Sequence, residues 1–211
     1  MARILLTSGP TRQYLDPVRY LTNASSGRMG AALAAAFLDA GHEVVIVSGP
    51  VDVEYPPGAE VVPIVSTEDM LEVCLNLFPN CDGMIGAAAP CDYRPIRVAP
   101  HKLSKTGESL KLHLVETPDV IALCGAIKEH QWMVAFALET EDQRMRALQK
   151  LERKSADLIV LNGPGAIHAK ATDVEMIDPS GEILAAIAGT KEAVAAEIAR
   201  VVSDRLITPA T

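Results

Sequence analysis

The chain has 211 residues, of which 49% are apolar, and a formal net charge of −8. This length suffices for one α/β domain with a sizeable core and is too short for two large domains. The acidic balance disfavours a general binder of nucleic acid or of anionic membranes, because such proteins are usually basic. No stretch reaches the roughly 18 apolar residues that a membrane span needs, and the opening apolar run is too short for a signal peptide.

Short apolar runs that end at glycine, proline or serine predict strands, and apolar residues that recur on one face predict helices. In chain order these signals give strand 4–7, helix 28–40, strand 43–48, strand 61–65, a helix capped by Thr67, strand 83–89, strand 110–115, a helix from Pro118 to about 127, strand 132–138, helix 142–154, strand 158–161, a hairpin of strands 174–177 and 183–187, and helix 190–206.

Strands that alternate with helices predict a Rossmann-like, doubly wound and mostly parallel sheet. The late hairpin and strand 110–115 break the alternation, so we expect them to form a small additional sheet. Neither a repeat nor an obvious linker divides the chain. We therefore expect a single domain over 1–211, with a frayed tail at 208–211.

The connection between the first strand and the first helix is long and polar. It lies where doubly wound sheets bind their ligands, and long loops in compact domains are usually functional. Ser25, Ser26 and Gly27 directly precede the helix, so their N–H groups and hydroxyls are placed to hold a phosphate at its positive end. The alternative is a helix cap with a long surface loop.

An ordinary dinucleotide-binding enzyme is the obvious rival. The G-x-G-x-x-G fingerprint is missing, and the second strand ends in Ser48, Gly49 and Pro50, where an NAD enzyme places an acidic residue for the ribose. A Walker loop is missing as well. A short-chain oxidoreductase would need a Tyr-x-x-x-Lys pair, which none of the four tyrosines provides.

Two later segments carry features of a ligand site. The small residues 87–89 end a strand, and Asp92 follows where a ribose hydroxyl or Mg²⁺ is met. Residues 94–111, below called the basic loop, hold five basic residues and one acidic residue, a net charge of +4 in an acidic protein. This composition indicates a mobile flap that closes on a triphosphate. The alternative for the segment with Asp92 is a turn with one solvated acidic residue. The alternative for the basic loop is an ordinary solvated surface loop.

Lys150 and Lys154 share one helix face because they are four residues apart. The segment 136–140 again follows a strand end. Ordinary surface is the alternative for both. The five histidines have no metal-ligand spacing. The four cysteines form no C-x-x-C pair or zinc pattern, so we expect reduced thiols in a cytoplasmic protein.

These segments together resemble the phosphopantothenoylcysteine synthetases, the phosphopantothenate–cysteine ligases of coenzyme A synthesis. The resemblance rests on TSGPTR at 7–12, DPVRY at 16–20 and NASSGRMG at 23–30, followed in order by DYRP at 92–95, the lysines of the basic loop, TPD at 117–119, FALET at 136–140, and Lys154, Asp157 and Asn162.

The resemblance implies a homodimer that uses CTP and Mg²⁺. It implies that the carboxylate of 4'-phosphopantothenate attacks the nucleotide, that pyrophosphate leaves, and that the amine of cysteine attacks the acyl nucleotide. Such chemistry needs charge neutralisation and positioning more than a protein nucleophile. The late hairpin and strand 110–115 are expected to build the dimer contact.

The resemblance also assigns roles by matching position. Asn23 holds the acyl nucleotide for the attack of cysteine, and Lys102 promotes its formation. Arg12, Arg19 and Asn23 bind the substrate, and Asp92 is the candidate metal ligand. The residues expected to bind the nucleotide or its phosphates are Gly9, Ser25, Ser26, Gly27, Ala88, Asp92, Lys105, Asp119, Phe136, Lys150 and Lys154.

The chain departs from the family pattern in three ways. Ser104 stands where the flap usually has a lysine, and Pro90 and Cys91 replace small apolar residues before Asp92. The flavin-dependent decarboxylase domain found in most bacterial relatives is missing, so we expect neither flavin nor decarboxylase activity, and a separate decarboxylase in the cell. The departures leave open a non-catalytic relative that binds a nucleotide or coenzyme A precursor.

Overall fold

The computed structural model describes residues 1–138, 142–162 and 172–207. Its main sheet has eight strands, in the order β12-β11-β10-β9-β6-β1-β4-β5. Their bounds are β1 Arg3–Ser8, β4 Glu43–Ser48, β5 Glu60–Pro63, β6 Gly83–Gly86, β9 Trp132–Leu138, β10 Leu158–Asn162, β11 Thr172–Ile177 and β12 Ile183–Gly189. The strands from β10 to β5 are parallel, which confirms the predicted doubly wound, mostly parallel sheet.

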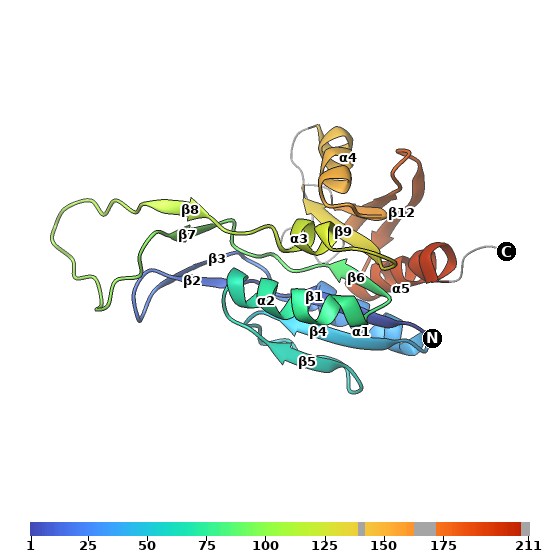
Figure 1. Cartoon of the computed structure of the whole chain (residues 1–211), viewed down its shortest axis with the longest axis horizontal. Coiled ribbons are helices and arrows are strands. Elements are labelled where there is room, and N and C mark those ends of the chain that lie inside the picture. The colour runs from blue at the N-terminus through green and yellow to red at the C-terminus, as the bar shows by residue number, and fades with distance from the viewer. Residues whose placement is uncertain (139–141, 163–171, 208–211) are drawn as a thin grey trace.

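Helices cover both faces of this sheet (Figure 1). One face carries α1 (Arg28–Asp39) and α5 (Lys191–Val202), and the other carries α2 (Thr67–Leu77), α3 (Val120–Ala126) and α4 (Gln143–Arg153). Alternate residues of a central strand therefore enter different cores, which explains the unbroken apolar runs of the central strands. Among the described residues, no helix combines the length and apolarity that a membrane crossing requires.

Two short hairpins extend beyond the carboxyl edge of the sheet (Figure 1). In one, β2 (Arg12–Tyr14) pairs with β3 (Tyr20–Thr22). In the other, β7 (Tyr93–Pro95) pairs with β8 (Leu114–Glu116), and the basic loop connects these two strands. The predicted strand 110–115 thus begins later than expected, and its place outside the main sheet is confirmed. The strands β2, β3 and β7 were not predicted, because three residues show no periodicity.

The late hairpin was expected in a small separate sheet, and this prediction is wrong. It joins the main sheet, because β11 pairs antiparallel with β10 and β12 pairs with β11. Val174 and Met176 on β11 are buried in the core beneath α5, so the hairpin extends that core. The predicted turn is confirmed, since the Ser180 N–H donates to Asp178 Oδ1 at 2.9 Å.

Two helix starts differ from their predictions. Ser66, not Thr67, caps α2: the Asp69 N–H donates to Ser66 Oγ at 3.0 Å, and the Ser66 N–H donates to Asp69 Oδ2 at 2.8 Å. This reciprocal pair is a capping box. Asp119, not Pro118, begins α3, because Asp119 Oδ1 accepts the Ala122 N–H at 3.1 Å. The Thr67 hydroxyl is left for contacts at the candidate site.

We expect Ser66→Ala to lower the free energy of unfolding by about 1 kcal/mol, because α2 loses its cap. Ser66→Asp keeps a side-chain acceptor and should stay within a few tenths of a kcal/mol of the wild type. Urea denaturation followed by circular dichroism measures both. Equal losses in the two variants would show that the cap is not what stabilises this helix.

Candidate active site

A cavity of about 370 Å³ lies at the carboxyl edge of the sheet. It opens where the strand order reverses, between β1 and β6, since the chain runs from β1 to β4 on one side and returns to β6 on the other. This switch point is the usual ligand site of doubly wound folds, and the volume suits a small organic ligand. The cavity lies at the carboxyl edge of the sheet, as expected, but the connection between β1 and α1, where the sequence analysis expected the phosphates, does not line it.

Part of the cavity lining is small or aromatic and includes Gly86, Ala88 and Phe136. A Cβ on Gly86 would lie 2.5 Å from Ile121 Cδ1, so a larger residue would displace the start of α3. These small residues leave room for a flat ring. Ala88 and Phe136, both predicted to frame a nucleoside, meet here.

Charged residues also line the cavity, and two of them form an ion pair between the start of α3 and the end of α4. Lys154 Nζ donates to Asp119 Oδ1 at 2.6 Å and to Oδ2 at 2.7 Å. Arg153 Nη2 adds a contact of 3.2 Å to Oδ2. The side chain of Lys154 is 12% exposed and that of Asp119 is 35% exposed, so the pair is partly shielded from solvent screening.

The pair shifts the ionisation of both partners. Burial by itself would raise the pKa of Asp119, but the hydrogen bond and charge of Lys154, the Ala122 N–H and Arg153 hold this pKa below its usual value. Burial lowers the pKa of Lys154, and Asp119 offsets part of that effect. Asp119 is therefore ionised at neutral pH and fixes the ammonium group at the cavity wall.

Four segments meet at the backbone of Cys91, beside the cavity. The Cys91 N–H donates to Thr11 Oγ1 at 2.8 Å, and the Cys91 carbonyl accepts the hydroxyls of Thr67, at 3.2 Å, and Thr117. The hydroxyls of Thr11 and Thr67 also contact each other at 2.8 Å. We call these four residues the threonine cluster. It fixes the loop between β6 and β7 against the start of α2.

The thiol of Cys91 is not a nucleophile in this arrangement. Burial raises the pKa of the thiol, so it is protonated at neutral pH, and its sulfur lies 3.4 Å from the Thr11 carbonyl. All four cysteines are buried and none forms a disulfide, in keeping with the expected reduced thiols. The site thus agrees with chemistry that relies on positioning and charge.

Asn23 lies next to the cavity-lining residues rather than among them. Its Nδ2 donates to the carbonyls of Pro90, at 2.8 Å, and Ala89, at 3.3 Å.

Gly27 directly precedes α1 with a φ of 74°, and no side chain caps this helix. A Cβ on Gly27 or on Gly9 would lie within 3 Å of Val51 Cγ1, so Val51 packs closely over both glycines.

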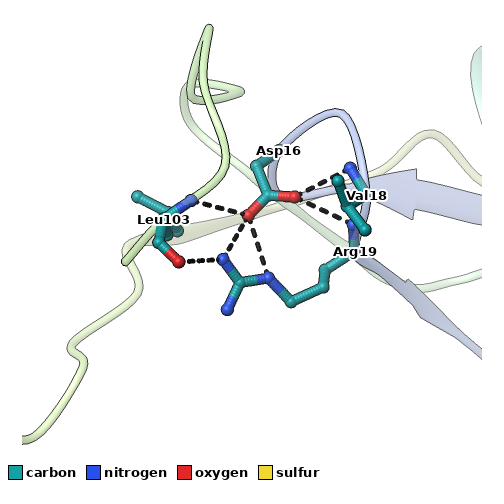
Figure 2. Close-up of polar contacts among 4 residues, drawn as sticks. All are labelled: Asp16, Val18, Arg19 and Leu103. Atoms are coloured by element: carbon teal, nitrogen blue, oxygen red, sulfur yellow. Dashed lines mark hydrogen bonds and ion pairs between the residues drawn. The ribbon is translucent and has the colours of Figure 1, made fainter. Parts of the chain in front are cut away.

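The arginines and lysines predicted to reach the substrate lie on or beside the two hairpins. Arg12 stacks on Tyr20, with its Cζ 4.6 Å from the ring centroid. Arg19 donates through Nε to Asp16 Oδ2 at 2.9 Å (Figure 2). Lys102 and Lys105 are in the basic loop, which projects away from the sheet (Figure 1), and neither lines the cavity in this conformation.

The structure thus gathers part of the predicted set around the cavity. The predicted residues that line it are Ala88, Asp92, Asp119, Phe136, Lys150 and Lys154. The predicted residues outside its lining are Gly9, Arg12, Arg19, Asn23, Ser25, Ser26, Gly27, Lys102 and Lys105. Glu139 and Thr140, the end of the 136–140 motif, lie outside the described residues.

Sequence reasoning missed Arg153, Glu116 and Ile121 as cavity-lining residues. A signal for Arg153 was present, because it follows Lys150 by three residues and so shares its helix face. Glu116 and Ile121 gave no signal of their own. They lie on either side of the Thr117–Asp119 motif, and their position in the cavity lining is visible only in the folded structure.

Mg²⁺ is the metal that the family resemblance implies, with Asp92 as its candidate ligand. Among the described residues, no three His, Cys, Asp or Glu side chains are close enough to form a metal site by themselves. Asp92 and Glu116 nevertheless both line the cavity. Mg²⁺ is commonly bound by one or two carboxylates together with the phosphates of a substrate, and these two residues fit that arrangement.

The parallel sheet and the cavity at its switch point define a doubly wound α/β protein with a candidate small-molecule site at this edge. Residues 1–206 match the model of the family described as DNA/pantothenate metabolism flavoprotein C-terminal domain, and the chain belongs to this family. The resemblance inferred from the sequence motifs is thereby confirmed.

Individual relatives are similar in sequence to most of this chain. The coenzyme A biosynthesis bifunctional protein CoaBC of Bacillus subtilis (strain 168) is 42% identical over 160 residues, which are 75% of this chain and 39% of that protein. A cysteine/cysteine sulfinic acid decarboxylase of an unknown prokaryotic organism is 39% identical over 206 residues, which are 94% of this chain and 57% of that protein. The chain thus spans less than two thirds of either relative.

One solved structure matches nearly the whole chain. The crystal structure of the C-terminal domain of a coenzyme A biosynthesis bifunctional protein CoaBC has a TM-score of 0.80 and 36% sequence identity. The match covers 95% of this chain and 93% of that one. The fold of this chain is therefore that of the C-terminal domain of CoaBC.

We expect Asp119→Asn to lower the free energy of unfolding at pH 7 by roughly 1 to 3 kcal/mol, between the values for exposed and buried pairs, because Lys154 loses its counter-charge. The folded pKa of Asp119 is depressed, so its stabilisation is complete above an unfolded pKa of about 3.9 and is lost as the pH falls through the folded value. The difference from wild type should therefore shrink in acid.

Urea denaturation at several pH values measures this difference. Glu197→Gln is the matched control, because it removes one partner of the exposed pair with Arg200, whose side chain is 58% exposed. That variant should change the stability by less than about 1 kcal/mol. A loss for Asp119→Asn that is the same at pH 7 and in acid would contradict the ion-pair interpretation.

Proposed function

We propose that this protein is a phosphopantothenate–cysteine ligase, which joins 4'-phosphopantothenate and cysteine into 4'-phosphopantothenoylcysteine. The observation that carries the proposal is the cavity at the sheet edge, where residues predicted to frame a nucleoside lie beside residues predicted to hold its phosphates. Family membership and the 36% identity to the C-terminal domain of a CoaBC protein support it.

The reaction passes through an acyl nucleotide, with CTP as the favoured nucleotide. A carboxylate oxygen of 4'-phosphopantothenate attacks the α-phosphorus, the bond to the β-phosphate breaks, and pyrophosphate leaves. The amine of cysteine then attacks the acyl carbon, the amide forms, and the nucleoside monophosphate leaves with loss of an amine proton. The protein supplies orientation and charge stabilisation.

The charge of the cavity explains why additional cations are needed. Lys150, Arg153 and Lys154 line the cavity, and so do Asp92, Glu116 and Asp119. Three basic and three acidic side chains leave no formal excess of positive charge for a triphosphate. The basic loop, with its net charge of +4, and Mg²⁺ held by Asp92 and the phosphates would supply it; a bound Mg²⁺ neutralises charge on phosphate oxygens.

We assign each predicted site residue to the nucleoside, the phosphates, the acyl nucleotide or the substrate. Ala88, Asp92, Asp119 and Phe136 frame the nucleoside, while Lys150 and Lys154 lie near the triphosphate. Lys102 promotes formation of the acyl nucleotide, and Asn23 holds it for the attack of cysteine. The remaining proposed contacts are those of Gly9, Ser25, Ser26, Gly27 and Lys105 with phosphates, and of Arg12 and Arg19 with substrate.

We also expect a homodimer whose contact is built by the late hairpin and segment 110–115. Exposed apolar side chains in both segments support it, among them Leu110, Leu114 and Ile183, each more than a third exposed. That the protein acts without flavin stays a prediction, which the visible absorption spectrum of the purified protein tests.

A non-catalytic relative that binds a nucleotide is the second candidate. The observation in its favour is that neither Lys102 nor Lys105 lines the cavity, while Ser104 occupies a position where the family flap usually carries a lysine. Such a protein would bind CTP without releasing pyrophosphate. The two candidates therefore differ in one measurable product.

Pyrophosphate release by the purified protein separates them. The reaction contains Mg²⁺, 4'-phosphopantothenate and cysteine, with CTP and ATP in parallel. Release that requires 4'-phosphopantothenate establishes activation, and its faster nucleotide gives the specificity; mass spectrometry of the amide product establishes the ligase. A thermal shift with CTP but no pyrophosphate would support the binding protein instead.

We expect Asn23→Asp to form the acyl nucleotide and to stall before the amide. An aspartate cannot donate to the carbonyls of Ala89 and Pro90, which Asn23 Nδ2 contacts, so the side chain loses the contacts that orient it for holding the intermediate. Quenched-flow mass spectrometry should detect the accumulated acyl nucleotide. The CTP thermal shift serves as the control for an intact cavity, and undiminished amide formation would remove Asn23 from this role.

A further inference from the structure

A buried carboxylate joins the β2–β3 turn to the basic loop. The side chain of Asp16 is 0% exposed. One of its oxygens, Oδ1, accepts the N–H groups of Val18 at 2.8 Å and Arg19 at 2.9 Å. The other, Oδ2, accepts the Arg19 guanidinium and the N–H of Leu103 at 3.1 Å, as Figure 2 shows. One oxygen thus shapes the turn while the other reaches across to the loop.

The loop is held by its main chain at this point. The Leu103 N–H donates to Asp16, and the Leu103 carbonyl accepts Arg19 Nη2 (Figure 2). Because both contacts involve backbone groups, they fix the path of the chain whatever side chain stands at position 103. A second tie precedes them, where the Ala99 N–H donates to the Leu15 carbonyl at 2.9 Å.

Beyond Leu103 the loop is no longer tied. Among the described residues, the hydrogen bonds of segment 104–110 stay within it, as in the contact of 3.4 Å between the Glu108 N–H and Thr106 Oγ1. The ladder of β7 and β8 closes the base of the loop, extended by the Ile96 N–H, which donates to the His113 carbonyl at 3.0 Å. The loop therefore has an anchored limb, 96–103, and a return limb without such anchors.

Asp16 is suited to this task because it stays ionised. Burial by itself would raise the pKa of its carboxyl, but the hydrogen bonds from Leu103, Val18 and Arg19 hold that pKa well below its ordinary value. A carboxylate is an acceptor at both oxygens, so it serves the turn and the loop together. A neutral amide has one acceptor oxygen and cannot serve both.

We propose that Asp16 and Arg19 form a latch that clasps the backbone of Leu103 and thereby holds Lys102 beside the β2–β3 hairpin, outside the cavity lining, at the point from which the basic loop closes for formation of the acyl nucleotide. Lys102 precedes the clasped residue directly, with its Cα about 3.8 Å from that of Leu103. Its backbone is thus fixed to the β2–β3 hairpin. This inference rests on the proposed function only for the role of Lys102; the latch itself is a property of the free protein.

The latch is tested first without any ligase assay, by limited trypsin digestion after Lys105. Asp16→Asn removes the second acceptor, and Leu103→Pro removes the loop-side N–H while the turn keeps its bonds. Each variant should raise the rate of cleavage after Lys105 by at least about tenfold, the lower end of what losing a hydrogen bond to a charged group implies. The double variant should be no faster than the faster single one, because both remove the same contact.

Leu103→Ala is the matched control, because it keeps both backbone groups. Its cleavage rate should equal that of the wild type. Wild-type cleavage in Asp16→Asn, or a Leu103→Ala rate as high as that of Asp16→Asn, would overturn the latch. Additive effects in the double variant would overturn it as well. Urea denaturation confirms that the variants compared are folded.

The positioning role is then read from the steady-state kinetics of Asp16→Asn. The kcat for pyrophosphate release should fall, because a smaller share of the molecules holds Lys102 in place, with the KM for the nucleotide within about twofold of wild type. A KM effect without a kcat effect, or a rise in kcat, would overturn the positioning role. If the wild type releases no pyrophosphate, the proposed function fails, and the cleavage experiment still decides the latch.

Discussion

The close approach of three backbone segments at the end of β1 determines how the rest of the site is arranged. A Cβ on Gly49 would lie 1.6 Å from the Pro10 carbonyl oxygen, and one on Gly30 would lie 2.0 Å from Ser8 Oγ. The chain that leaves β1 therefore passes between the end of β4 and the first turn of α1 only because both positions lack side chains. The Ala89 N–H then donates to the Gly9 carbonyl at 2.9 Å, which ties this path to the end of β6.

This path also explains why the fold is no ordinary dinucleotide-binding domain. The end of β4, where an acidic residue would meet a ribose, is occupied by the backbone of Pro10. The hydroxyl of Ser48 is engaged there by Tyr55, at 2.7 Å, and by the Gly49 carbonyl, at 2.8 Å. The cavity lies instead on the other side of β1, between β6 and α3.

Much of the fold could be predicted because its central strands are buried on both faces and read as apolar runs. The position of the late hairpin in the sheet could not be predicted. Its pairing with β10 depends on which sheet edge is open, and the local sequence does not encode that. At the site, Lys150 and Lys154 were recognisable from their helical spacing. The threonine cluster was not, because its members are neutral, common residues brought together from four distant segments of the chain.

The segment between β1 and α1 thus joins three parts of the site. At its start Thr11 enters the threonine cluster beside the cavity, at its end Asn23 contacts the loop after β6, and at its tip Asp16 clasps the basic loop. A shift of the hairpin would therefore move all three contacts together. The substitution of Pro90 and Cys91 for small residues falls at the point where two of them meet. Its effect should thus extend beyond the cavity wall to the hairpin that bears the latch.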